Sequence, residues 1–395
     1  MYIETIKKYS NEIIEDIINT RRYLHSNPEL SFQEFKTSKF IKNKLLSYGI
    51  ETHDEIAQTG VKGILRGKFS GKTIAIRADM DALPVLEMNK NTFNSKNKGV
   101  MHACGHDLHM SIVLGVAKIL SLLKNNLYGN IIFIFQPGEE GYAGAKKMIS
   151  EGILSSPNVD SIIATHVSPN LKTGQISVSK GPAMASNSKL KIIIKGKGGH
   201  AAQPNKSINP ILIASNLVDL INKIVVPNED PLESAILTIT SFNSGNTYNV
   251  IPEEAIIRGT VRSFNSSLDY KIFKKIDTLI ESITKTFDVE YKLFYEVEYP
   301  PVINDEEIVD LIIKSAKDIL APKDIFNNAI PLMLAEDFAY YTQKVPGALF
   351  HLGCLNVNSN YNLHSNKFNP DENCIQFGLE LIAYTVLNFL DSPKN

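Results

Sequence analysis

The spacing of hydrophobic and polar residues changes near residue 50 of the chain. Residues 1–49 have a helical pattern, in which Ser31–Glu34 reads as a capping box that opens a helix and Gly49 could close it. Short, continuous apolar runs of β-branched and aromatic residues follow. Such runs are typical of strands buried on both faces of a largely parallel sheet, with helices between them. The first three runs lie at 73–76, 130–135 and 161–164, and a helix is expected across 110–124.

Carboxylates and a histidine follow these three runs. The first run leads to Asp79 and Asp81, the second to Glu139 and Glu140, and the third to His166. In open α/β sheets, ligand sites gather beyond the carboxyl ends of the strands. We therefore expect these side chains to share one edge of the sheet.

The segment Met101–His109 holds three histidines, a cysteine and an aspartate within nine residues. Imidazole and thiolate are preferred ligands of zinc, and the spacing of Cys104 and His106 lets one tight turn offer two of them. Alone, such a segment is equally typical of solvated or helix-capping histidines. It lies just before the expected helix, so it can reach the same edge. A fourth apolar run, Ala348–Leu352, precedes His364, a further candidate from the C-terminal part.

The pattern differs again between about residues 184 and 296. A partly alternating strand is followed by a helix, two strands, a second helix and a last strand. This βαββαβ order matches a ferredoxin-like α+β unit with both helices on one face of an antiparallel sheet. We expect an inserted domain at 184–296 between two parts of a catalytic domain, 1–183 and 297–395. The inserted elements are expected at 189–195, 210–224, 235–241, 255–263, 270–287 and 290–297.

Length and composition set outer limits on function. The 395 residues exceed the roughly 250–300 at which one core stops growing, so two domains are expected. A net charge of −1 gives no basic footprint for nucleic acid or an anionic membrane. Three cysteines argue against a disulfide framework and fit a reducing cytoplasm. The amphipathic start has no signal-peptide core and the longest apolar stretch is too short to span a membrane, so a soluble cytoplasmic protein is expected.

The acidic candidates each have a second interpretation. Glu139 and Glu140 could be solvated loop carboxylates. At the end of a buried strand, however, one of two adjacent carboxylates can bind metal while the other takes a proton from the attacking water. Asp79 and Asp81 could cap a turn, bind metal or orient a histidine.

The remaining candidates are weaker when taken one at a time. His166 could be a buried histidine bonded to backbone, and His364 could be simply exposed. His200 lies in a Gly-Gly-His loop that could be no more than a turn. Arg262 could clamp a carboxylate with two hydrogen bonds or lie unused on the surface.

Ordered motifs along nearly the whole chain resemble those of the dimetal amidohydrolases related to aminoacylase, hippurate hydrolase, N-acetyl-diaminopimelate deacetylase and plant indole-acetyl-amino-acid hydrolases. The resemblance implies a mostly parallel-sheet α/β catalytic domain with an inserted α+β ferredoxin-like lid that also forms a homodimer. The motifs are Arg77–Pro84, Met101–Asp107, Gln136–Gly141, His166, Gly198–Pro204, Asn249–Pro252, Gly259–Arg262, Glu336–Phe338 and His364. That many motifs in the same order argue against a chance match.

The resemblance also implies a role for each candidate residue. Glu139 would be the general base. His200 would reach the active site of the partner subunit and stabilise the oxyanion, while Asn249 and Arg262 would hold the substrate's carboxylate. The ligands of two divalent ions would be Cys104, His106, Glu140, His166 and His364.

Two positions depart from the wider relatives. Asp79 stands where those relatives place a ligating histidine, and Asp81 matches the aspartate that orients a metal-site histidine, so the separate roles of the two aspartates stay open. Cys104 stands where the wider clan has a bridging aspartate, which points to the amidohydrolase subgroup and away from aminopeptidases. Mixed cysteine, histidine and carboxylate ligands suit zinc, and manganese, cobalt or nickel are alternatives.

These features predict a metal-dependent amidohydrolase of N-acyl amino acids, of the deacetylase, aminoacylase or hippurate-hydrolase type. Metal ions would polarise the amide carbonyl and activate water, and Glu139 would carry the water's proton to the departing amine. A carboxypeptidase or dipeptidase with the same chemistry is one alternative. A catalytically inactive metal-binding relative is another, although an intact Glu139 beside a full ligand set argues against it. A structural zinc site fits less well, because its ligands usually come in paired, short-spaced sets with no base nearby.

Overall fold

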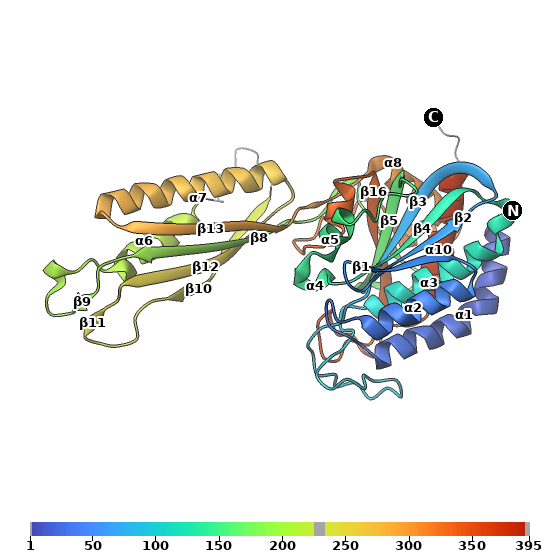
Figure 1. The fold of residues 1–395 in the computed structure, drawn as a ribbon, viewed down its shortest axis with the longest axis horizontal. Helices are drawn as coiled ribbons and strands as arrows, with labels where there is room; N and C mark the ends of the chain where they lie inside the picture. Colours follow the sequence, from blue (N-terminus) through green and yellow to red (C-terminus); the bar gives the residue numbers. More distant parts are fainter. Residues whose placement is uncertain (1, 225–233, 392–395) are drawn as a thin grey trace. The chain divides into compact units, whose positions relative to one another are not determined.

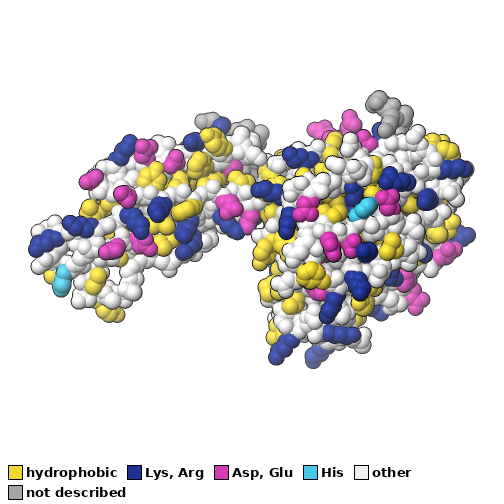
Figure 2. Space-filling model, in the orientation of Figure 1, with side chains coloured by type: hydrophobic (Ala, Val, Ile, Leu, Met, Phe, Trp, Pro, Cys, Tyr) yellow, Lys and Arg dark blue, Asp and Glu magenta, His cyan; other side chains and the backbone are white. Residues whose placement is uncertain are grey.

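The computed structural model describes residues 2–224 and 234–391, and the chain forms two compact units (Figure 1). The first unit contains Met1–Ala183, Ile303–Ile330 and Asp337–Asn395, and the second contains Met184–Val302 and Pro331–Glu336. Acidic and basic side chains are interspersed over the visible face of both units (Figure 2).

The first unit is built on a mixed sheet with a parallel centre. In the described residues the strand order is β1-β2-β4-β3-β5-β16-β6-β15. β3 pairs in parallel with β4 and β5, and β5 in parallel with β16, while β1 and β2 form an antiparallel edge. The expected largely parallel sheet is therefore confirmed. The strands are β1 Glu51–Ile56, β2 Gly60–Arg66, β3 Phe69–Asp79, β4 Tyr128–Gln136, β5 Ser161–Lys172, β6 Ile176–Ser177, β15 Ile325–Phe326 and β16 Gly347–Leu355.

Helices of the first unit pack on one another as well as on the sheet. α1, α2 and α3 lie side by side, and α10 packs against α1 and α3 (Figure 1). Their buried apolar residues join those of β3, β4 and β16 in one core, because strands buried on both faces need a helical layer to keep water out. The helices are α1 Tyr2–Ser26, α2 Phe35–Ser47, α3 His106–Leu122, α4 Glu139–Tyr142, α5 Gly144–Ser150, α8 Glu306–Lys317, α9 Ala339–Thr342 and α10 Cys374–Leu390.

The start of α2 corrects one prediction from the sequence. The helix begins at Phe35, and neither Ser31 nor Glu34 caps it with a side chain. Instead, Oε2 of Glu29 accepts hydrogen bonds from the backbone N–H groups of residues 36 and 37, both at 2.9 Å. The predicted end is correct: Gly49 has φ +72°, and the N–H of Ile50 donates to the carbonyl of Leu45, as in a Schellman motif.

The second unit has the predicted ferredoxin-like order. Its antiparallel sheet runs β10-β12-β8-β13, and the buried residues of α6 and α7 form one core with alternate residues of β8 and β12. Alternation is the pattern of a sheet with only one covered face. The main elements are β8 Asn187–Lys195, α6 Pro210–Asn222, β10 Ala235–Asn243, β12 Glu254–Ser263, α7 Ser266–Phe287 and β13 Glu290–Tyr299. A two-stranded ribbon joins β9 Gly199–His200 to β11 Val250–Ile251, and β7 Gly181–Met184 and β14 Val302–Asn304 lie where the chain passes between units.

Candidate metal centre

The pairing of the central strands brings the candidate residues to one level of the sheet. Asp79 ends β3 opposite Gln136, the last residue of β4, and Arg77 pairs with Ala164 of β5. His166 therefore lies level with Asp79. One detail differs from the sequence prediction: β5 does not end at His166 but continues to Lys172, so this histidine projects from within a strand.

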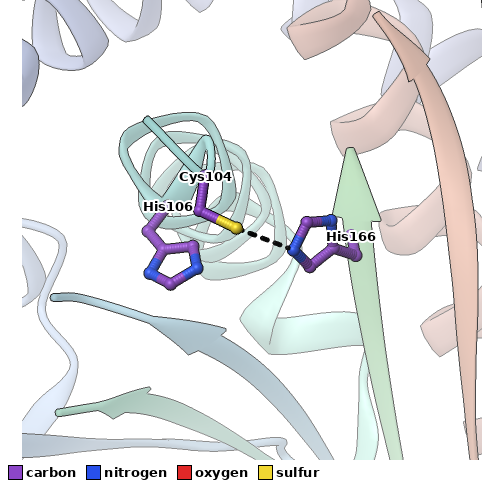
Figure 3. Close-up of side chains that lie close together, drawn as sticks. All are labelled: Cys104, His106 and His166. Atoms are coloured by element: carbon purple, nitrogen blue, oxygen red, sulfur yellow. Dashed lines mark hydrogen bonds between the residues drawn. The ribbon is translucent and has the colours of Figure 1, made fainter. Parts of the chain in front are cut away.

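Cys104 lies at the centre of the candidate ligands. Its Sγ is 3.5 Å from Nε2 of His166 and 3.3 Å from Nε2 of His364, and Figure 3 shows the sulfur pointing to His166 from beside His106. His106 is the first residue of α3, which begins earlier than the expected residue 110. His364 reaches the sulfur from a loop in which its φ is +65° and its N–H donates to the carbonyl of Ala103 at 2.8 Å.

Two sets of possible ligand atoms share the Cys104 sulfur. One set joins it to His106 and His166, and the other joins it to Glu140 and His364. Within each set all ligand atoms lie within 4.8 Å of one another. A thiolate common to both sets would bridge two ions, so the five residues fit a pair of divalent metals.

The histidines present the correct nitrogen for metal binding. Nδ1 of His106 donates to the backbone carbonyl of Asp81 at 2.8 Å, and its buried Nε2 has no hydrogen-bond partner. Nδ1 of His166 donates to the carbonyl of Val167 at 2.8 Å, which leaves its Nε2 facing Cys104. A ring fixed by one nitrogen and bare at the other is the usual state of a ligating histidine.

The charges of the site favour a cation. Burial, followed by Glu140 and Glu139, raises the pKa of the Cys104 thiol well above its usual value, so a nearby cation is needed to hold it as thiolate. Burial would lower the pKa of His106, but the carboxylates of Asp79 and Asp81 raise it to about 10. The carboxylates around His106 thus favour a positive charge at this point of the site.

Asp81 organises the turn that carries Glu139 and Glu140. Its Oδ1 accepts from the N–H of Glu139 at 3.1 Å and its Oδ2 from the N–H of Glu140 at 3.0 Å. Oδ1 also lies 3.4 Å from Nδ1 of His106. Burial would raise the pKa of Asp81, but His106, and after it the N–H of Glu140 and the hydroxyl of Ser31, lower it below its usual range. The side chain therefore stays an acceptor. Asp81 therefore orients both the glutamate turn and a candidate ligand.

Asp79 faces a different set of partners. Its Oδ2 accepts from Arg77 at 2.7 Å and its Oδ1 from Nδ1 of His109 at 2.6 Å. Since the N–H of Val167 donates to Nε2 of His109 at 2.9 Å, both nitrogens of His109 are engaged. Asp79 and His109 thus fix the backbone beside His166. With His106 they also form a further group whose ligand atoms lie within 4.8 Å of one another.

The sequence analysis gave no separate role to Arg77, Gln136 and Asp337. Nη2 of Arg77 donates to Oδ1 of Asp337 at 2.8 Å, and the amide nitrogen of Gln136 lies 2.8 Å from both oxygens of that aspartate. All three side chains are buried. The motifs containing them were the only signal, because the contacts join residues up to 260 positions apart.

The other members of the Met101–His109 segment lie outside the two ligand sets. Asp107 accepts from Nδ1 of His25 at 2.8 Å, and its Oδ2 also lies 2.8 Å from Nε of Arg21 in a buried ion pair. His102 is buried without a hydrogen-bond partner, and burial lowers its pKa to about 4, so it is a neutral ring.

His200, Asn249 and Arg262 belong to the second unit. The ribbon of β9 and β11 pairs His200 with Val250, and the N–H of Ala201 donates to the carbonyl of Asn249 at 3.0 Å, so the first two lie on one exposed tip. Arg262 is half-buried on β12, and burial lowers its pKa. Their expected roles at the metal centre stay predictions.

Comparison with known proteins identifies the family. The model of peptidase family M20/M25/M40 matches residues 75–388. The chain is 37% identical to an N-acetyl-L-cysteine deacetylase of Bacillus subtilis, over 99% of this chain and 94% of that protein. It is 38% identical to thermostable carboxypeptidase 2 of Saccharolobus solfataricus, over 98% of both chains. A crystal structure of a dinuclear metal-binding peptidase from Bacillus subtilis superposes with TM-score 0.85 at 33% identity, covering 96% of this chain and 99% of that one.

Among the helices of residues 2–224 and 234–391, none combines the length and the hydropathy that a membrane span requires.

The family match begins within β3 and covers the later strands of the sheet, the second unit and every member of the two ligand sets. The resemblance inferred from the sequence motifs is thereby confirmed. The chain belongs to peptidase family M20/M25/M40.

Proposed function

We propose that this protein is a metal-dependent amidohydrolase that cleaves N-acyl amino acids. The observation that carries the proposal is the pair of ligand sets sharing Cys104, with the buried carboxylate of Glu139 next to them and outside both. The similarity to a deacetylase of N-acetyl-L-cysteine supports an N-acyl amino acid as the substrate class.

The chain's own residues divide the reaction between them. Cys104, His106, Glu140, His166 and His364 would hold two divalent ions, of zinc or manganese, with cobalt or nickel as alternatives. Such ions supply Lewis acidity for the amide carbonyl and the attacking water. Glu139 takes the proton of the water and passes it to the departing amine, which must leave protonated. Asp81 holds the backbone of Glu139 during this transfer, and Asp79 supports His166 through His109.

Residues of the second unit complete the proposal. We assign 184–296 to a lid and dimerisation domain, and 1–183 with 297–395 to the catalytic domain. His200 would donate to the oxyanion in the partner subunit of a homodimer, a contact whose loss costs roughly 2.7–4 kcal/mol of transition-state stabilisation. Asn249 and Arg262 would bind the substrate's carboxylate. A cytoplasmic location fits three cysteines that are all buried and free.

A carboxypeptidase is the second candidate, and the similarity to thermostable carboxypeptidase 2 is the observation that favours it. Both activities need the same metal centre, so the substrate decides between them. The discriminating experiment is a panel of N-acetyl amino acids, hippurate and dipeptides, assayed on apoprotein reconstituted with each metal in turn. Faster cleavage of peptides than of N-acyl amino acids would replace the first proposal with the second.

The variant Glu139→Gln tests the mechanism. It should bind the same amount of metal as wild type and lose about 10²–10⁴-fold in kcat, the usual contribution of a positioned general base. Near wild-type turnover would remove Glu139 from this role.

A further inference from the structure

The segment Ser31–Glu34 does not cap α2, and its side chains contact the glutamate turn instead. Oγ of Ser31 donates to Oδ2 of Asp81 at 2.7 Å. Oε1 of Glu34 accepts from the N–H of Gly138 at 3.1 Å, and Oε2 accepts from the hydroxyl of Thr59 at 2.6 Å. The capping-box residues are therefore engaged with residues 50 and 104 positions away.

Two carboxyl groups hold three consecutive backbone amides. Glu34 accepts from Gly138, and Asp81 accepts from the next two residues, Glu139 and Glu140. Backbone geometry makes this turn dependent on outside support: Gly138 has φ +64°, and the backbone angles of Glu140 are not helical although it lies in α4. A turn without regular backbone hydrogen bonds needs other acceptors for its N–H groups.

Side chains also pack closely around Gly138. A Cβ added to Gly138 would lie 2.9 Å from the ring of Phe32, so this glycine is required by contact as well as by its φ. Phe32 itself has φ +59°, a conformation that costs an aromatic residue free energy. The chain thus keeps a strained residue between Ser31 and Glu34, with its ring packed against Gly138 of the turn.

The burial of Glu34 also lowers the stability of the folded state. The side chain is fully buried, and burial raises its pKa to about 7. A carboxyl group whose ionisation is disfavoured by its surroundings destabilises the native state at neutral pH. Stability alone does not explain a glutamate here, whereas support of the turn does.

We propose that Glu34 is a positioning residue for Glu139. Together with Asp81 it holds the backbone of residues 138–140, so that the Glu139 carboxylate keeps one position for proton transfer. The inference rests on the proposed function, since it takes Glu139 as the general base. Glu34 acts only through the turn.

The test compares three variants with a matched control. Glu34→Met fills a similar volume but offers no oxygen acceptor, whereas Glu34→Gln keeps one. Glu29→Met is the control, because Glu29 lies five residues before Glu34 and also accepts two backbone N–H groups, but those belong to α2. Glu139→Gln is measured in parallel to test the base itself. Readouts are kcat, KM, bound metal, melting temperature and hydrogen exchange of the amides of residues 138–140.

Glu34→Met should lower kcat by about 10–100-fold, the usual effect of losing an outer-shell partner, with KM and metal content unchanged and exchange at 138–140 faster. Glu34→Gln should retain most of the wild-type turnover, because it keeps an oxygen acceptor. Glu29→Met should lower the melting temperature and leave kcat unchanged. In wild type, the amides of residues 138–140 should exchange as slowly as those of β4. This measurement tests the geometry even if Glu34→Met does not fold.

Any of three results would overturn the inference. The first is a folded Glu34→Met with wild-type kcat, and the second is an equal loss of kcat in Glu34→Met and Glu29→Met. The third is fast hydrogen exchange of the amides of residues 138–140 in wild type. Retained activity in Glu139→Gln would instead overturn the proposed role of Glu139 as general base. The two failures are thus distinguishable.

Discussion

Replacing Glu34 with glutamine should change how the stability of the protein depends on pH. Burial, followed by a smaller contribution from Asp81, raises the pKa of Glu34 from 4.5 to about 7, against the hydrogen bond from Thr59, which lowers it. Between these values the folded protein keeps the proton and the unfolded chain has lost it. Raising the pH through this window therefore favours unfolding.

The size of the effect follows from the two pKa values. A pKa difference of about 2.5 corresponds to roughly 3 kcal/mol, since each unit is worth about 1.4 kcal/mol. Wild type should lose most of this stability between pH 5 and pH 8. Glu34→Gln has no such proton to lose and resembles the protonated acid. Over the same pH range, the free energy of unfolding of this variant should therefore rise relative to wild type by the amount that wild type loses.

The assay is urea unfolding of both proteins at several pH values, followed by circular dichroism because the chain has no tryptophan. Other titrating groups are common to the two proteins and cancel in the difference. Thr59→Val, which removes the hydrogen bond that lowers the Glu34 pKa, should move the loss of stability to higher pH. A constant stability difference between wild type and Glu34→Gln from pH 5 to pH 8 would refute the reasoning, because it would mean that burial does not raise this pKa.

Three further variants test the metal centre and its support. Arg77→Met leaves two buried carboxylates without their cation and should destabilise the protein by about 3–5 kcal/mol in urea unfolding; a loss under 1 kcal/mol would contradict this. His109→Phe removes the support of His166 and should weaken metal binding about 10–100-fold in chelator competition, and an unchanged affinity would show that the support is not needed. Cys104→Ser removes the shared ligand, so elemental analysis should find fewer than two ions per chain, and two tightly held ions would exclude the bridging role.

The Asp79 and Asp81 pair illustrates the limit of reasoning from the sequence. Both follow a buried strand, and each could have capped a turn, bound metal or oriented a histidine. Their partners are instead fixed by elements elsewhere: Arg77 and His109 for Asp79, and the turn after β4 for Asp81. No local pattern distinguishes the two, because side-chain direction at a strand end depends on what packs against it.

The capping box shows a different kind of failure. Ser31–Glu34 satisfies the local rule for a helix start, and the rule predicts the wrong contacts. The competing partners, Asp81 and Gly138, are brought to this segment by the packing of α2 against the first strands of the sheet. Once buried, a polar side chain must keep its distant partners because no water can replace them, whereas a cap exposed to water can exchange its partner for solvent.

The sequence by itself determined the type and order of the elements, the parallel sheet, the ferredoxin-like unit and the residue types that suit a metal. These depend on short-range periodicity and on residue chemistry, which can be read along the chain. Only the tertiary structure decided that Cys104 is shared by two ligand sets, that His109 supports rather than binds, and that Glu34 holds the turn of Glu139. These depend on distances between residues far apart in the chain, and packing alone sets such distances.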